Sequence, residues 1–360
     1  MGNATCCSST KHTNLSGYIG SEISKCIERN DIKHLGRLLS ILPNQDLNLD
    51  SEIIIIKKVT LNPLTYALLT GKDKIFKFIY DKGADLSIMD RILNSFNVKA
   101  IDIICERGYL DLLQYYLPIY LKSFRDSPNS PEIPEQTLNF ASSIETNAQN
   151  VLTPAQRACD KGHISIITYL YKYFKSKKFV PRLFDLDYPS EKTGETCALI
   201  ACRKGNYALI KVLHTICNVD FNVHNRYDEN AIIICVCAYR IEKNPSYLDC
   251  IKYLIEKVGL DISYMHEEIL ILSECEELIY YIEQKLQDKN IIVTKAEIDE
   301  KYNIKRHKPS DSYEACDSNE FFSSTLRRYL DDGDSSRVST ISQISSKSDL
   351  IYASIFAPNY

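Results

Sequence analysis

Apolar and polar positions follow a helical period along much of the chain, most clearly from Leu152 to Phe174. Thr153 can cap a helix through its side-chain oxygen, and Pro154 suits the first helical position, where no backbone N–H is needed. Gly162 suits the left-handed residue that ends this helix. Behind it, apolar residues recur at helical spacing: Ile164, Ile166, Ile167 and Leu170. The pattern predicts two antiparallel helices with one apolar side, which needs further copies of the same hairpin to bury it.

Such copies are present. Four glycines mark the same place in successive hairpins: Gly71, Gly108, Gly162 and Gly205. A turn made of aspartate, an apolar residue and a polar residue recurs at 46–48, 85–87, 220–222 and 261–263. These signals and the helical period predict hairpins over 21–39, 62–85, 99–117, 152–174, 196–213, 228–257 and 267–286.

Together, the glycine, a column of alanine or cysteine and the aspartate turn resemble the ankyrin repeat over residues 21–287. The opening 62–67 keeps the proline, leucine and alanine of the family's TPLHxA pattern, but has asparagine for threonine and threonine for histidine. The resemblance implies an all-α fold, an ankyrin-repeat solenoid of about six to seven degenerate repeats. It also implies short β-hairpins after the aspartate turns, and a protein-binding concave surface of hairpin tips and inner helices.

The composition outside the repeats predicts the domain organisation. Residues 1–20 form a flexible leader, 21–287 the repeat domain, 288–307 a short helical extension and 308–360 a disordered Ser-rich tail. A capping box from Thr294 to Glu297 opens the extension. Residues 123–150 contain three prolines, and we interpret them as an inserted loop rather than a domain boundary, because the repeat resumes in phase after them.

Several function classes are not expected. The formal net charge of -4 gives no electrostatic reason to expect a nucleic-acid partner. No apolar run reaches the roughly 18 residues of a spanning helix, and no secretory signal opens the chain, so a cytoplasmic location is expected. No P-loop, GxSxG, HExxH or kinase catalytic-loop motif occurs, and the histidines are scattered. We therefore expect no enzyme, no catalytic residues, no cofactor and no small-molecule substrate.

The 13 cysteines raise the alternatives of disulfides or a metal site. Cys105, Cys159 and Cys202 share one column, three residues before the recurring glycine, where the ankyrin pattern has alanine. Cys235 and Cys237 lack the two-residue spacing of a zinc site. We expect these cysteines to pack in the core and to hold no metal.

The N-terminus resembles that of doubly acylated peripheral membrane proteins. Removal of Met1 would expose Gly2 for myristoylation, and Cys6 and Cys7 could take palmitate, although Cys6 stands where serine or threonine is preferred. A second chain is needed because myristate alone binds membranes only marginally. The alternative is a plain disordered leader.

Two further segments carry candidate sites. Ser127 and Ser130 precede prolines and, with Ser339 in the tail, are candidate phosphorylation sites, although the first two also suit a plain linker. A tail cluster could form one helical face: Phe322, Leu326, Tyr329 and Leu330. This face could dock on a partner or fold back on the repeats, and both interpretations stay open.

The sequence thus predicts a non-enzymatic protein-binding scaffold or adaptor, tethered by N-terminal lipid to the cytoplasmic face of a membrane. The alternative is a soluble ankyrin-repeat inhibitor or assembly factor without lipid. In either case the expected partner is a protein on the concave surface, and the sequence does not identify it.

Overall fold

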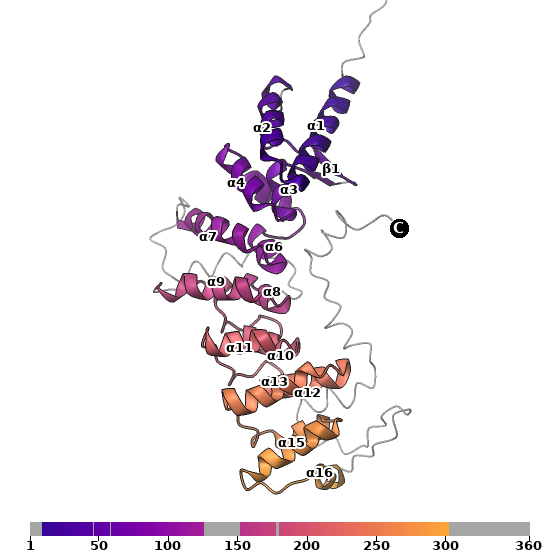
Figure 1. Cartoon of the computed structure of the whole chain (residues 1–360), viewed down its shortest axis with the longest axis vertical. Coiled ribbons are helices and arrows are strands. Elements are labelled where there is room, and N and C mark those ends of the chain that lie inside the picture. The colour runs from indigo at the N-terminus through magenta and orange to yellow at the C-terminus, as the bar shows by residue number, and fades with distance from the viewer. Residues whose placement is uncertain (1–8, 46, 58, 126–151, 178–179, 302–360) are drawn as a thin grey trace, which may run out of the picture. The chain divides into compact units, whose positions relative to one another are not determined.

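The computed structural model describes residues 9–45, 47–57, 59–125, 152–177 and 180–301 (Figure 1). Their contacts divide the chain into two compact units, with the boundary between Leu138 and Asn139. This division falls within the segment 123–150, outside the described residues, so the repeat domain over 21–287 with an inserted loop at 123–150 stays a prediction.

The described residues of unit 1 form three helical hairpins, α1–α2, α3–α4 and α6–α7. Its elements are α1 (Ser9–Arg29), α2 (Ile32–Ile41), η1 (Leu42–Gln45), β1 (Ile54–Ile56), β2 (Val59–Leu61), α3 (Pro63–Leu69), α4 (Asp73–Asp81), α5 (Leu86–Asn94), α6 (Ala100–Arg107) and α7 (Leu110–Arg125). Helix α3 packs against α1 on one side and α6 on the other, so the hairpins stack in chain order.

Unit 2 contains four hairpins in its described part, α8–α9, α10–α11, α12–α13 and α14–α15. Its elements are α8 (Pro154–Asp160), α9 (Ile164–Lys175), η3 (Arg182–Phe184), α10 (Cys197–Arg203), α11 (Tyr207–Thr215), α12 (Ala231–Glu242), α13 (Ser246–Tyr253), η4 (Leu254–Val258), α14 (His266–Leu272), α15 (Glu276–Gln287) and α16 (Lys295–Lys301). The first helices α8, α10 and α12 lie in one row, and α9, α11 and α13 in a second (Figure 1), and α14 packs against α12.

The predicted all-α fold class is confirmed: the described residues are mainly helical with a single two-stranded sheet, and each predicted repeat position holds a helical hairpin. The predicted caps are present as well. Thr153 and Gln156 form a capping box at α8, with N–O distances of 3.0 and 3.2 Å. Thr294 and Glu297 form another at α16, with distances of 2.8 and 3.3 Å.

Two predicted segment ends in unit 1 are wrong. Helix α1 begins at Ser9, so the leader predicted over 1–20 is helical from there; Ile19, Ile23 and Ile27 are all buried and continue one apolar face along α1. Helix α7 ends at Arg125, so the first residues assigned to the loop 123–150 are helical.

The β-hairpins expected after the aspartate turns are present only in part. Strands β1 and β2 pair antiparallel with Ile54 opposite Leu61, and a single bridge joins His224 to Asn230 after the turn at 220–222. The prediction is wrong at Asp85, whose side chain accepts a hydrogen bond from the Ser87 N–H at 2.8 Å and caps helix α5. Helix forms there because three residues at helical spacing become buried: Met89, Ile92 and Leu93.

The recurring glycines do more than end a helix. Gly205 has φ +57°, and a Cβ there would lie 2.7 Å from the Tyr247 ring. The Tyr247 hydroxyl in turn donates to the backbone carbonyl of Arg203, the last residue of α10, at 3.0 Å. Gly71 and Tyr109 repeat the arrangement in unit 1, where the Tyr109 hydroxyl donates to the Leu69 carbonyl at 3.2 Å. At these two of the four recurring glycines, a tyrosine of the later hairpin thus packs on the glycine of an earlier one.

The cysteine column lies in the core. Cys105, Cys159 and Cys202 have no exposed surface, and burial raises the pKa of the Cys159 thiol. Buried neutral thiols act as small apolar side chains, so the interpretation of these cysteines as core residues is confirmed.

Candidate functional site

None of the site residues predicted from the sequence lies in the described part of the chain. The lipidation candidates Gly2, Cys6 and Cys7, the serines Ser127, Ser130 and Ser339, and the cluster Phe322, Leu326, Tyr329 and Leu330 all fall outside it. The structure therefore brings none of them together, and they stay predictions.

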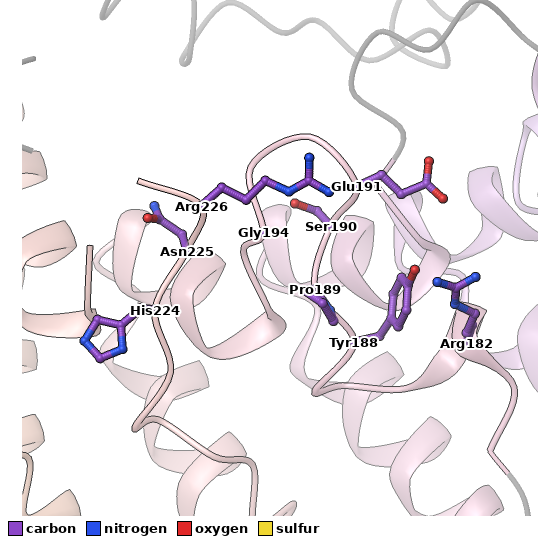
Figure 2. A pocket seen from close by; sticks show the side chains of 9 residues that line it. All are labelled: Arg182, Tyr188, Pro189, Ser190, Glu191, Gly194, His224, Asn225 and Arg226. Atoms are coloured by element: carbon purple, nitrogen blue, oxygen red, sulfur yellow. The ribbon is translucent and has the colours of Figure 1, made fainter. Parts of the chain in front are cut away.

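The described residues do form a pocket of about 390 Å³ in unit 2, where two loops meet (Figure 2). We call the loop between α9 and α10 loop A (180–196) and the loop between α11 and α12 loop B (216–230). Loop A contributes Arg182, Tyr188, Pro189, Ser190, Glu191 and Gly194, and loop B contributes His224, Asn225 and Arg226.

Hydrogen bonds within loop A hold its tip in one tight turn. The Ser190 N–H donates to the Glu195 carbonyl, and the Gly194 N–H donates to the Ser190 carbonyl, both at 2.9 Å. The hydroxyls of Ser190 and Thr193 are 2.6 Å apart, so the serine oxygen is already bound within the turn. Gly194 has φ +74°, a conformation that residues with a Cβ adopt only with strain.

Buried charged side chains connect loop A to the helices beside it. The Glu195 carboxylate lies 3.1 Å from Nε of Arg203 on α10, and the Arg203 guanidinium also pairs with Asp160 on α8 at 3.4 Å. Burial lowers the pKa of Arg203, but Glu195 and Asp160 outweigh this and raise the pKa overall, so the guanidinium stays charged. Fully buried Gln156 donates to the Tyr188 and Glu195 carbonyls at 2.8 and 3.2 Å. The loop is thereby tied to two helices.

Loop B has a comparable internal structure. The Asn225 side-chain oxygen accepts from the Tyr227 and Glu229 N–H groups at 2.9 and 3.0 Å, and its nitrogen donates to the Glu229 carboxylate at 2.6 Å. These bonds fix the backbone on either side of Arg226.

Two hydrogen bonds donated by backbone N–H groups of loop B join it to loop A. The Arg226 N–H donates to the Thr193 carbonyl at 2.8 Å, and the Asp220 N–H donates to the Asp187 carboxylate at 3.1 Å. These bonds tie the two pocket walls to each other.

Two arginines give the pocket its charge. The Arg182 guanidinium stacks on the Tyr188 ring, 4.3 Å from the ring centre. Arg226 extends from loop B toward loop A, with its stem against Gly194, where a Cβ would lie 2.9 Å from Cγ of Arg226 (Figure 2). Both arginines are exposed, and neither guanidinium makes an ion pair or hydrogen bond with a described residue. The pocket thus offers charge and aromatic surface for non-covalent binding.

Two further observations concern the described part of the chain alone. Within it, no three His, Cys, Asp or Glu side chains gather as a metal site requires. No helix in the same ranges combines the length and the low polarity needed to cross a bilayer.

Sequence reasoning missed this pocket, although one signal pointed to it. Asp185, Leu186 and Asp187 are a further copy of the recurring aspartate turn, with the Asp187 N–H donating to the Asp185 carboxylate at 3.1 Å. That copy would have placed loop A at the same edge as the turn of loop B at 220–222.

Comparison of the sequence with models of known protein families gives no match, and no curated protein matches it either. Among solved structures, the chain is similar to the crystal structure of the ankyrin repeat domain of Bcl-3, described there as a unique member of the IkappaB protein family. The identity is 13% and the TM-score 0.44, and the similarity covers 72% of this chain and 96% of that chain. The two share too little sequence to transfer a partner or a function.

Proposed function

We propose that this protein is a non-enzymatic scaffold that binds a partner protein at the pocket between loops A and B. One observation carries the proposal: Arg182 and Arg226, from two different loops, line one pocket whose backbone is fixed by hydrogen bonds and buried charges. Exposed polar and aromatic side chains on loops of a rigid scaffold are the usual means of protein recognition. A preformed site also loses little conformational entropy on binding, which favours affinity.

Photo-crosslinking tests this location of the binding surface. We expect p-benzoylphenylalanine in place of exposed Lys192 on loop A to crosslink the full-length protein to a partner in its native cell extract, because that side chain borders the pocket. Mass spectrometry of the crosslinked band identifies the partner and the contacting peptide.

The matched control places the same probe at Lys211, which is exposed on helix α11 of the same unit. Position 211 is expected to give no such band. A partner captured equally well from both positions, or only from position 211, would show that binding occurs elsewhere on unit 2.

We further propose that lipid on Gly2, Cys6 and Cys7 tethers this scaffold to a membrane. The sequence pattern at these residues supports the proposal. Helix α1 begins at Ser9, so Cys7 precedes this helix by two residues in the sequence. The alternative, a soluble inhibitor or assembly factor without lipid, assigns no role to these three residues.

Cell fractionation separates the two possibilities. Gly2→Ala is expected to release the protein completely, because myristate brings the cysteines to the membrane where they are palmitoylated. The double variant Cys6→Ser, Cys7→Ser is expected to keep a weak, exchanging membrane fraction, since myristate alone has an affinity of about 10⁴ per molar. If the wild-type protein is found wholly in the soluble fraction, only the alternative of a soluble protein without lipid would stand.

A further inference from the structure

We infer that the pocket between loops A and B binds an acidic segment of the partner, with carboxylate or phosphate groups held by Arg182 and Arg226. The inference rests on the proposed function and names the chemistry of the partner. It follows from three observations: the orientation of each arginine, the charges around the pocket, and its size.

The position of the Arg182 guanidinium suits it to bind an anion. Its guanidinium lies 4.3 Å from the centre of the Tyr188 ring. The Gln156 side-chain nitrogen donates a hydrogen bond to the Tyr188 carbonyl at 2.8 Å and fixes the backbone there. Stacking occupies a face of the guanidinium and leaves the N–H groups at its edge available. Those edge groups match the two oxygens of a carboxylate or phosphate, and the charge-assisted pair is stronger than a neutral hydrogen bond.

Arg226 meets the same pocket from the opposite loop (Figure 2). Its backbone N–H donates to the Thr193 carbonyl at 2.8 Å, and its stem passes over Gly194, where a Cβ would collide with it. The absence of a side chain at Gly194 thus lets Arg226 cross toward loop A. Two arginines on opposite walls suit successive anionic groups along one extended segment.

The charges around the pocket favour an acidic ligand. Glu195 is paired with Arg203, and the Glu229 carboxylate accepts from Asn225, so both carboxylates are already bound inside the loops. Glu191 is the one carboxylate among the pocket-lining residues, against two guanidiniums. The lining residues alone thus carry more positive than negative charge, although the chain has a formal net charge of -4 and loops A and B also contain Asp185, Asp187, Asp220 and Asp228.

The size of the pocket selects the kind of anion. A volume of about 390 Å³ accommodates a few side chains of an extended segment. A nucleic-acid backbone would require a longer basic surface, and in this pocket Glu191 lies among the lining residues. The geometry therefore favours an acidic or phosphorylated peptide over a nucleic acid.

Fluorescence anisotropy with labelled peptides tests the inference on the full-length protein. The probes are a tetraglutamate peptide, a peptide with two phosphoserines, and a tetraglutamine peptide as the neutral control. At about 50 mM salt we expect the acidic probes to bind, the neutral probe not to bind, and binding to weaken as salt is raised to about 200 mM. The two acidic probes separate a carboxylate ligand from a phosphate ligand.

Variants assign the binding to the two arginines. Arg182→Gln with Arg226→Gln is expected to weaken binding about tenfold or more. Arg182→Lys keeps the charge but loses the stacked planar group, so an intermediate loss is expected. Glu191→Gln removes a repulsive carboxylate and is expected to tighten binding about twofold.

Arg37→Gln, an identical change on exposed helix α2, is the control and is expected to leave binding unchanged. Thermal unfolding of each variant checks that the protein remains folded. Failure of both acidic probes to bind, or equal binding by the double arginine variant, would overturn the inference.

The photo-crosslink at position 192 distinguishes this failure from failure of the proposed function. A partner still captured by the double arginine variant would keep the scaffold function and exclude the acidic segment. Acidic peptides that bind while no partner is captured from position 192 would keep the anion site and contradict the scaffold function.

Discussion

Gly205→Val is expected to lower the free energy of unfolding of unit 2 by about 3–5 kcal/mol, more than backbone strain alone would cost. Gly205 has φ +57°, which a β-branched residue adopts only with strain. A Cβ there would also lie 2.7 Å from the ring of Tyr247, which has no exposed surface and cannot easily move. Strain and overpacking therefore add. Urea unfolding followed by circular dichroism and tyrosine fluorescence measures the loss.

Gly259→Val is the matched control. Gly259 has φ +81°, but no atom lies within 4 Å of its Cβ position, so this change introduces backbone strain alone. We expect a loss of about 1–3 kcal/mol. Equal losses at both positions would show that the contact between Gly205 and Tyr247 contributes nothing to stability.

Arg203→Met is expected to cost about 2–4 kcal/mol and to loosen loop A, because it leaves a buried carboxylate without its partner. The Glu195 side chain is only 9% exposed and lies 3.1 Å from Arg203. Hydrogen exchange within 186–196 should become faster, together with a lower unfolding midpoint in urea.

The double variant Arg203→Met, Glu195→Gln tests the cause. Removing the unpaired charge should recover part of the lost stability, since neutral glutamine pays a smaller desolvation penalty. A double variant no more stable than Arg203→Met alone would mean that the arginine acts through packing rather than charge.

The helical hairpins could be predicted from the sequence because their signals are local. Thr153 caps a helix that starts one residue later, and Gly162 follows its end. The buried residues of the next helix then recur at helical spacing. Cys159 could be placed in the core by its column alone. Helix α5 was missed because Asp85 caps a helix as readily as it opens a β-turn, and burial of Met89 decides between them only in the folded chain.

The pocket could not be predicted, because its geometry depends on contacts between distant residues. Arg182 and Arg226 lie in stretches without helical period, and the Arg226 backbone is positioned by a hydrogen bond to Thr193 in the other loop. The tyrosines that pack on the glycines do not occupy the same position in their repeats: Tyr109 directly follows a glycine, whereas Tyr247 follows a short insertion. Only the folded structure brings each onto the preceding hairpin.

The contact between glycine and tyrosine also gives hairpin assembly a direction. Gly71 and Gly205 precede their tyrosines in the chain, and so do the carbonyls of Leu69 and Arg203 that accept from those tyrosines. During synthesis, the glycine and the acceptor carbonyl therefore leave the ribosome before the tyrosine that packs on them. At these two junctions, the later hairpin can therefore add to a hairpin that has already been synthesised.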